Sequence, residues 1–334
     1  MELRRQTLTS EFLHPGRDFE PYQGQVEVRW DPLTGHAARL VTAGGPLLPP
    51  SSFDLAAYAA ETQPGCFFCG KRVEEVTPRL LPAIDPGGRI KRGQALLFPN
   101  LLTYSQYSSV SIYSPDLHYL PLDRMSGRLV ADNLAVQAEF ARAVARHDPE
   151  ATWASVNANH MLPAGSSIFH PHIQSSIDPV PSTMQQQLAE TGRERFADYL
   201  ETEKRLGERY LGSLGSTEWL VSFAPQGFNE IRALVPGAAS PAQLASEQVE
   251  ELGEGIGRVL NLYGELGFQS FNMALLGAPP GLDGYVLNLR LVCRSNLQPL
   301  YRSDVTYFER LHWQAMVDGR PEELAERARP RFRG

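Results

Sequence analysis

One order of predicted elements occurs twice along this chain of 334 residues. In each half, two strand-like runs precede an amphipathic helical stretch, and two further strand-like runs follow it. The first half has these runs at about 95–98, 108–115, 128–146, 153–159 and 170–174, and the second half at about 218–225, 230–236, 240–263, 269–277 and 284–292. Such a repeat predicts an internal duplication in which each helix lies on an antiparallel sheet.

The predicted fold class is therefore α+β, with two duplicated halves built from antiparallel sheets and packed helices. We expect the first half to span residues 1–182 and the second to span 183–334, beginning with a charged, helix-prone segment. Aligning the copies places 155–159 against 270–273, and it places the run from His170 to His172 against the run from Asn288 to Arg290. Because the second copy lacks the histidines, the sequence predicts one chemically equipped half and one degenerate half.

The helix of the second half has a clear predicted start. Ser240 is the expected N-cap, Pro241 takes the first helical position, and Gln243 completes a possible capping box. Its apolar face is expected to contain Val249, Leu252, Ile256, Val259 and Tyr263. The first sixty residues are instead rich in Pro and Gly, with a short strand expected at 26–30, and we expect them to form an arm that lies over the core.

Composition excludes several classes of partner. The formal charge of −7 argues against a broad cationic surface for nucleic acid or an anionic membrane, so any phosphate binding must be local. No apolar run has the roughly 18 to 20 residues needed to span a bilayer, and the first residues do not resemble a signal peptide, so a cytoplasmic protein is expected. Three cysteines do not suggest a secreted disulfide framework.

Cys66 and Cys69 have the two-residue spacing that allows both thiolates to face one metal ion. His118 and His170 are available to complete a tetrahedral site with two sulfur and two nitrogen ligands, for which zinc is the natural occupant. Such a site has no open position for water, so its expected role is structural. A redox-active dithiol or two unrelated thiols are the alternatives.

The run GSSIFHPHIQ at 165–174 places His170, His172 and Gln174 at alternate positions, so on a strand all three side chains would point the same way. His172 is the candidate nucleophile, because a neutral imidazole can attack phosphorus and divide one nucleotidyl transfer into two steps. Gln174 can donate its amide to a phosphate oxygen. Gly165 permits close approach of the backbone, and the hydroxyls of Ser166 and Ser167 can donate to phosphate. The alternative is that both histidines are ordinary hydrogen-bonded residues.

This run resembles the active-site motif of the galactose-1-phosphate uridylyltransferase branch of the histidine-triad superfamily. Four further segments agree in order and spacing: RWDPLTG, GCFFCG, SPDLHYLPL and PLYRSDVTYFE. Together the five segments span most of the chain. The resemblance therefore implies two histidine-triad-like halves and a divergent member of this family.

The resemblance also implies roles for individual residues. His172 would be the nucleotidylated histidine, Gln174 its phosphate partner and Ser167 a phosphate contact. Zinc would be held by Cys66, Cys69, His118 and His170. The nucleoside would be flanked by Phe68, Phe98, Asn100 and Asn159. A homodimer is also implied, because subunits of the family complete each other's sites.

The chain departs from the family at two places. The glutamate and the His-x-His run that form a second metal site in the family correspond here to Leu188 and to Cys293-Arg294-Ser295, so we expect no second metal, and Cys293 is expected to be a buried core thiol. Where the family binds the hexose, this chain has Phe308-Glu309 and Trp313-Gln314, and the phosphate-binding arginines after PLTG are missing. The acceptor is therefore not expected to be galactose-1-phosphate.

Taken together, the sequence predicts a nucleotidyltransferase that moves a nucleoside monophosphate, UMP first and AMP second, from a nucleotide sugar through a nucleotidyl-His172 intermediate to a phosphorylated acceptor. A phosphorylase or hydrolase of nucleotide sugars or dinucleoside polyphosphates is one alternative, and a non-catalytic nucleotide-binding protein is another. Arg290 and Arg294 lie where they could reach an acceptor phosphate or form salt bridges. His160 is expected to be an exposed loop residue, with a contact to the substrate as the alternative.

Overall fold

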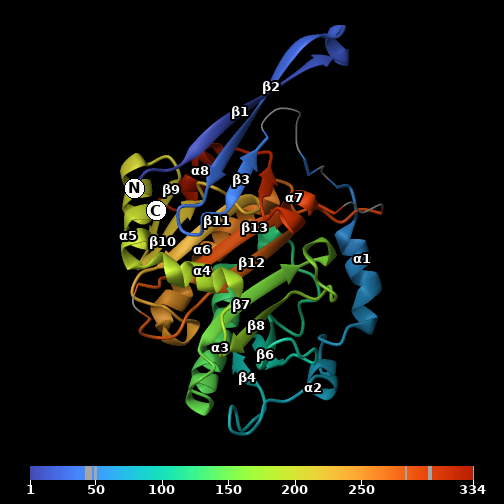
Figure 1. Cartoon of the computed structure of the whole chain (residues 1–334). Coiled ribbons are helices and arrows are strands. Elements are labelled where there is room, and N and C mark those ends of the chain that lie inside the picture. Colours follow the sequence, from blue (N-terminus) through green and yellow to red (C-terminus); the bar gives the residue numbers. More distant parts are fainter. Residues whose placement is uncertain (42–46, 49–50, 283, 300–302, 334) are drawn as a thin grey trace.

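The computed structural model describes residues 1–41, 47–48, 51–282, 284–299 and 303–333. Within these residues, ten strands form one antiparallel sheet (Figure 1). In spatial order these strands are β4 (Ile90–Arg92), β5 (Ala95–Pro99), β6 (Tyr107–Ile112), β8 (His172–Asp178), β7 (Trp153–His160), β12 (Ser270–Leu276), β13 (Leu287–Arg294), β11 (Phe228–Val235), β10 (Thr217–Val221) and β9 (Tyr210–Leu214).

This strand order shows the predicted duplication. The order in the second half mirrors that in the first, and β7 and β12 pair at the centre to join the two halves. The α+β fold class with duplicated halves is therefore confirmed. Short edge strands β4 and β9 were not among the predicted runs, since neither has a strong alternating pattern.

The strand registers support the alignment of the two copies. Asn157 on β7 is opposite Gln174 on β8, and Asn272 on β12 is opposite Val292 on β13. With Asn157 and Asn272 aligned, the position equivalent to His172 is Arg290. The sheet is continuous across β7 and β12, so it does not itself mark where one half ends. From the sequence repeat, we propose that the first half ends at residue 182 and that the second begins at residue 183.

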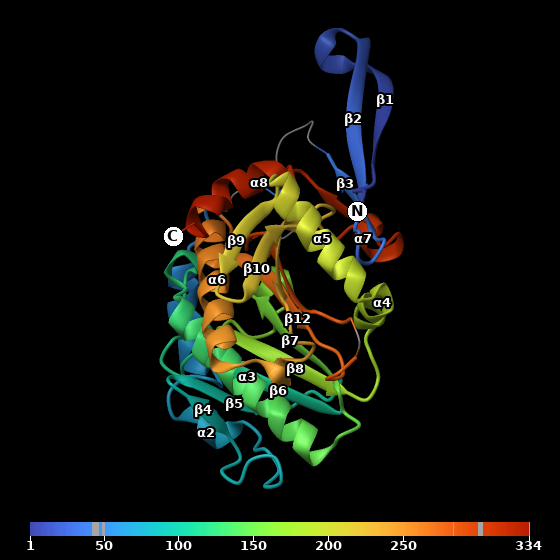
Figure 2. The same cartoon turned by 90° about the vertical axis from the view of Figure 1, so that its left-hand side faces the viewer.

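Two long helices pack side by side on one face of the sheet, and α4 and α5 lie on the other side (Figure 2). The helices are α1 (Leu55–Thr62), α2 (Arg72–Val76), α3 (Gly127–His147), α4 (Thr183–Thr191), α5 (Arg193–Leu206), α6 (Ser246–Glu265), α7 (Tyr307–Leu311) and α8 (Pro321–Ala328). The long helices α3 and α6 approach closely, because a Cβ added at Gly253 would lie 2.6 Å from the Cβ of Ala131. Within the described chain, no helix is long and apolar enough to cross a membrane.

The start of α6 differs from the prediction. The capping box of Ser240 and Gln243 is present, but it caps a single 3-10 turn, Pro241–Gln243, and α6 begins only at Ser246. The predicted apolar face is confirmed, since all five of its residues are buried: Val249, Leu252, Ile256, Val259 and Tyr263.

A second, four-stranded sheet contains the N-terminal segment. Its strands are β1 (Arg5–His14), β2 (Glu20–Trp30), β3 (Ala37–Leu40) and β14 (Ala315–Val317), and β3 pairs with β14 in parallel while the other pairs are antiparallel. The β1–β2 hairpin extends beyond the rest of the chain in both views (Figures 1 and 2). The strand expected at 26–30 is thus the end of a much longer strand. Arg29 and Asp31 lie against the second half, whereas the hairpin before them extends away from it, so the expectation that the whole arm lies over the core was wrong.

Candidate active site and metal cluster

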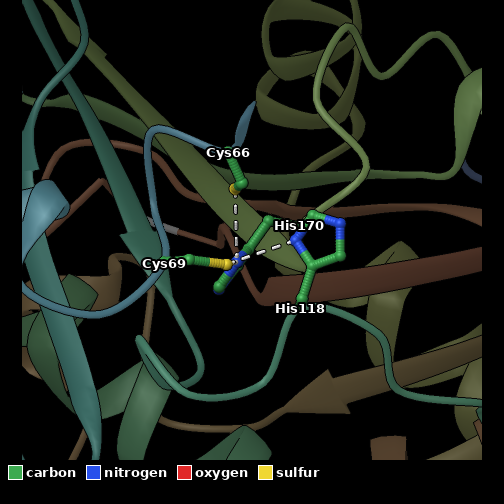
Figure 3. Close-up of side chains that lie close together, drawn as sticks. All are labelled: Cys66, Cys69, His118 and His170. Carbon is green, nitrogen blue, oxygen red and sulfur yellow. Dashed lines mark hydrogen bonds between the residues drawn. The ribbon is translucent and has the colours of Figure 1, made fainter. Parts of the chain in front are cut away.

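Four predicted ligands meet in one cluster (Figure 3). Cys66 follows the 3-10 turn Gln63–Gly65, His118 lies in the loop after β6, and His170 lies two residues before the start of β8. One ligand atom from each of Cys66, Cys69, His118 and His170 lies within 4.8 Å of all the others. The segments that carry them are far apart in the sequence, so the fold itself assembles this Cys2His2 set.

The spacing of the donor atoms fits a tetrahedral metal ion. The Cys69 Sγ lies 3.3 Å from His118 Nδ1 and 3.4 Å from His170 Nδ1, and the Cys66 Sγ lies 3.7 Å from His170 Nδ1. Zinc bound to one sulfur and one nitrogen at the tetrahedral angle would separate these atoms by about 3.6 Å. The cluster could therefore hold a metal with little rearrangement.

The second nitrogen of each histidine ring has its own partner. His170 Nε2 lies 2.9 Å from the Ser114 carbonyl oxygen, which can only accept, so this nitrogen donates and Nδ1 keeps its lone pair. His118 Nε2 lies 3.0 Å from the Thr62 hydroxyl, whose own proton goes to the Tyr58 carbonyl oxygen at 2.9 Å. Both imidazoles thus present Nδ1 to the thiols, as metal ligands require.

Burial also affects the charge of the cluster. It lowers the pKa of His170 to about 4, which keeps the ring neutral. Burial, and then the neighbouring Cys66 thiol, raise the pKa of Cys69 to about 12. A bound divalent cation would reverse this second effect, since it stabilises thiolates.

His172 is the first residue of β8, and His170 precedes the strand, so the predicted strand is shorter than expected at its start. The Nδ1 of His172 lies 2.8 Å from the His170 carbonyl oxygen and must donate to it. Nε2 is left with the lone pair, and burial lowers the pKa of His172, which favours the neutral ring. The rings of His170 and His172 both lie edge-on to Phe68, at 5.9 and 5.7 Å between centroids.

A pocket of about 330 Å³ opens in front of His172. Six predicted site residues line it: Asn159, Gly165, Ser166, Ser167, His172 and Gln174. Four further residues line it that the sequence did not single out: Leu102, Tyr104, Asn157 and Ser176. The alternation of a strand could have indicated Asn157 and Ser176, because each lies two positions from a predicted residue on the same face.

The other predicted nucleoside neighbours do not line this pocket. Phe68 and Phe98 are buried and pack against each other, with ring centroids 5.3 Å apart. Asn100 holds the loop that carries two lining residues, since its Oδ1 accepts from the Leu102 N–H at 3.1 Å and its Nδ2 donates to the Tyr104 hydroxyl at 2.9 Å. These three residues support the pocket rather than form its surface.

The hydroxyl of Ser166 has a local role. It donates to the Ile168 carbonyl oxygen at 2.6 Å and accepts from the Ile168 N–H at 3.3 Å, so its proton is engaged in the loop. Gly165 has φ of +93°, a left-handed conformation that favours glycine. Ser166 and Gly165 therefore shape the loop, and of the two predicted serines Ser167 is the better candidate for a ligand contact.

The prediction for His160 was wrong. His160 ends β7, is 3% exposed, and stacks on Phe271 with ring centroids 5.0 Å apart. Burial, and then the nearby His172, lower its pKa to about 3. His160 is buried because it stacks on Phe271 of the adjacent strand β12, a contact that the sequence alone does not reveal.

The arginines of the second half form salt bridges, one of the two predicted alternatives. Arg290 contacts Asp31 at 3.2 Å and Arg294 contacts Asp304 at 2.5 Å. Cys293 is fully buried, as predicted for a core thiol, and burial raises its pKa. In the C-terminal segment PLYRSDVTYFE, residues 300–302 lie outside the described residues.

Several solved structures share this fold, including the following three. An ADP-glucose phosphorylase from Arabidopsis thaliana, with bound ADP-glucose, has a TM-score of 0.69 and 18% identity, covering 91% of this chain and 98% of that chain. A GalT-like protein from Arabidopsis thaliana has a TM-score of 0.67 and 18% identity, covering 90% and 98%. A uridylyltransferase has a TM-score of 0.62 and 18% identity, covering 91% and 98%.

The protein therefore shares the fold of an ADP-glucose phosphorylase, a GalT-like protein and a uridylyltransferase, which is the fold that the sequence resemblance predicted. No protein-family model matches the chain. An uncharacterized protein from Archaeoglobus fulgidus is 32% identical over 338 residues, covering 98% of each chain. The chain belongs to one family with this archaeal protein.

Proposed function

We propose that this protein is an enzyme that transfers a nucleoside monophosphate through a covalent intermediate on His172. The observation that carries the proposal is the direction of the His172 ring: Nδ1 donates to the His170 carbonyl oxygen, and the ring lines the pocket beside Gln174. A neutral imidazole with its lone pair on Nε2 is the form that attacks phosphorus.

In the first step, Nε2 of His172 attacks the α-phosphorus of a nucleoside diphosphate compound. The bond from this phosphorus to the bridging oxygen breaks, and the leaving phosphate takes the electron pair. The imidazole becomes positively charged, and its Nδ1–H bond to the His170 carbonyl, 2.8 Å long, stabilises that charge. In the second step, an acceptor oxygen attacks the same phosphorus and returns the lone pair to Nε2.

Gln174 and Ser167 are proposed to bind phosphate oxygens. Gln174 is two residues beyond His172 on β8, so both side chains lie on the same face of the strand. An amide and a hydroxyl donate hydrogen bonds but are too weakly acidic to protonate the imidazole and so remove its nucleophilic lone pair. The Gly165 loop brings backbone close to the same space.

We propose that the Cys2His2 cluster holds one structural zinc ion. Cys66, Cys69, His118 and His170 would supply all four positions, so the ion has none left for substrate, and its chemistry would be to fix the segments that carry it. His170 connects this role to the reaction, because its side chain belongs to the cluster while its carbonyl orients His172.

For the second substrate we propose inorganic phosphate as a candidate beside a phosphorylated acceptor. The chain has Phe308-Glu309 and Trp313-Gln314 where the family binds a hexose, and its fold is shared with an ADP-glucose phosphorylase. The donor is proposed to be a nucleotide sugar, with UDP- and ADP-sugars as the two compounds to compare. We also propose a cytoplasmic homodimer.

The test is intact mass spectrometry after mixing the protein with UDP-glucose or ADP-glucose. The expected result is a covalent uridylyl or adenylyl adduct that is absent from His172→Gly and present in His147→Gly, a matched change at an exposed histidine. A chase with phosphate, galactose-1-phosphate or water then identifies the acceptor. Nucleotide binding by the wild type with no adduct and no turnover would reject the transferase in favour of a binding protein.

A further inference from the structure

Four polar side chains connect the second half of the chain to the pocket of the first half. Asp304 binds Arg294 with two parallel contacts, 2.7 Å from Nε to Oδ2 and 2.5 Å from Nη2 to Oδ1. Arg294 Nη1 then contacts Asn272 Oδ1 at 2.5 Å, and Asn272 Nδ2 contacts Asn159 Oδ1 at 2.7 Å. Asn159 lines the pocket, so the connected residues end at the candidate ligand site.

The N–H donors of Arg294 determine how the side-chain amides of Asn272 and Asn159 are oriented. A guanidinium has only donors, so the atom of Asn272 that faces it must be the oxygen. Asn272 is then left with Nδ2 to donate, and it does so to Asn159 Oδ1 and to the Ala164 carbonyl oxygen at 2.9 Å. Asn159 must therefore turn its own Nδ2 away from Asn272.

The free end of Asn159 lies beside the loop before His172. A Cβ added at Gly165 would lie 3.9 Å from Asn159 Nδ2, and both residues line the pocket. The contact from Asn272 to the Ala164 carbonyl fixes the same loop. The Asn159 side chain therefore presents N–H donors to the pocket at this point, and such donors can bind an anionic oxygen.

We propose that Arg294 is a positioning residue for the phosphate of a nucleoside diphosphate compound. It acts through Asn272 and sets Asn159 so that N–H donors face a non-bridging phosphate oxygen. This rests on the proposed function, because it assumes that the pocket in front of His172 binds the nucleotide. The half that lacks the histidines thus contributes to the site of the other half.

The matched variant is Asn272→Asp. It keeps an oxygen for Arg294 but removes the Nδ2 donor, so Asn159 must reverse its amide to donate to the new carboxylate, and its oxygen would then face the phosphate. We expect the dissociation constant of UMP or AMP, measured by calorimetry, to rise roughly 10- to 100-fold, because that is the change in affinity expected when one hydrogen bond to a charged group is lost. Binding of the uncharged nucleosides should change little.

The comparison with nucleosides separates the two explanations. A merely structural role would weaken nucleoside and nucleotide binding equally. Against an Asn159→Ala background, Asn272→Asp should add almost nothing, because its effect passes through Asn159. Arg294→Met should weaken nucleotide binding, with partial recovery in Arg294→Lys, and these variants replace Asn272→Asp as the test if that protein fails to fold.

Two results have distinct meanings. If the wild type binds neither UMP nor AMP, the proposed function fails. If the wild type binds a nucleotide and folded Asn272→Asp binds it equally well, the proposed function stands and the positioning role of Arg294 is overturned.

Discussion

Replacing Asp31 by asparagine tests how the N-terminal segment is held on the second half. The Asp31 carboxylate is buried between two arginines: one oxygen contacts Arg232 and, at 3.2 Å, Arg290, and the other accepts the Leu33 and Thr34 N–H groups at 2.8 and 3.2 Å. Asparagine has the same shape and keeps one oxygen. The substitution therefore removes a buried negative charge while it leaves the volume filled.

The expected cost follows from the pKa of the carboxyl. Burial alone would raise the pKa of Asp31, but the charges of Arg232 and Arg290 lower it from 3.8 to about 2. One pKa unit corresponds to about 1.4 kcal/mol, so the folded state gains roughly 2 kcal/mol from the ionised group. Without the charge of Asp31, the two buried arginines have only one carboxylate beside them, that of Glu230, which brings the expected loss for Asp31→Asn to about 3–5 kcal/mol.

The lowered pKa of Asp31 also makes the free energy of unfolding depend on pH. Because the folded pKa lies below the unfolded one, the stabilisation is complete above about pH 4 and disappears as the pH falls from 4 toward 2. The assay is urea unfolding of wild type and Asp31→Asn at neutral pH and at several values down to about pH 3. The difference between the two proteins should shrink as the solution becomes more acidic.

A matched control is Glu74→Gln, which removes the charge of an exposed pair with Lys91 and should leave the unfolding midpoint almost unchanged. A free energy of unfolding for Asp31→Asn within about 1 kcal/mol of wild type at neutral pH would refute the argument, since a buried pair broken on one side costs more than that. So would a difference that does not depend on pH.

Three further predictions concern the metal, the pocket and the helix packing. Cys69→Ser should lose most of the bound zinc in elemental analysis, whereas Cys293→Ser should keep it; equal zinc content in both would contradict the Cys2His2 assignment. Tyr104→Phe should raise the nucleotide dissociation constant by roughly 2- to 10-fold in calorimetry, because a pocket hydroxyl is lost, and unchanged affinity would exclude that contact. Gly253→Ala should lower the free energy of unfolding by about 1–3 kcal/mol in urea, because its methyl would lie 2.6 Å from the Cβ of Ala131, and a neutral effect would show that the two helices can separate without cost.

The sequence predicted the elements whose hydrophobic pattern is long and regular. The paired strands and the two long helices occur at the predicted places, because burial of one face imposes a period of 2 or 3.6 residues. The short strands β4 and β9 and the length of the β1–β2 hairpin were missed. Every residue of β1 from Arg5 to Leu13 is exposed, so this strand has no buried face to produce a pattern.

The site was predictable where chemistry restricts the residue type. Cys66, Cys69, His118 and His170 meet as expected, because few other side chains bind a transition metal. The lining of the pocket was less predictable, because it depends on which way a loop turns. Asn100 does not line the pocket but donates to the Tyr104 hydroxyl, a contact that nothing in the local sequence indicates, and its place beside the nucleoside stays a prediction.

The proposed role of Arg294 gives the second half a part in nucleotide binding that its sequence does not show. At the position equivalent to His172 it has Arg290, which the turn at Asp31 covers and neutralises, so this face cannot hold a second nucleotide in the same way. The end of the same strand, β13, nevertheless supplies Arg294, which lies two strands from β7 and is connected to Asn159 by Asn272. The second half has no histidine at the positions equivalent to His170 and His172, but the pairing of β7 with β12 places its side chains next to the first half. Substitutions that uncouple this pair should therefore reduce nucleotide binding even when every residue in contact with the nucleotide is intact.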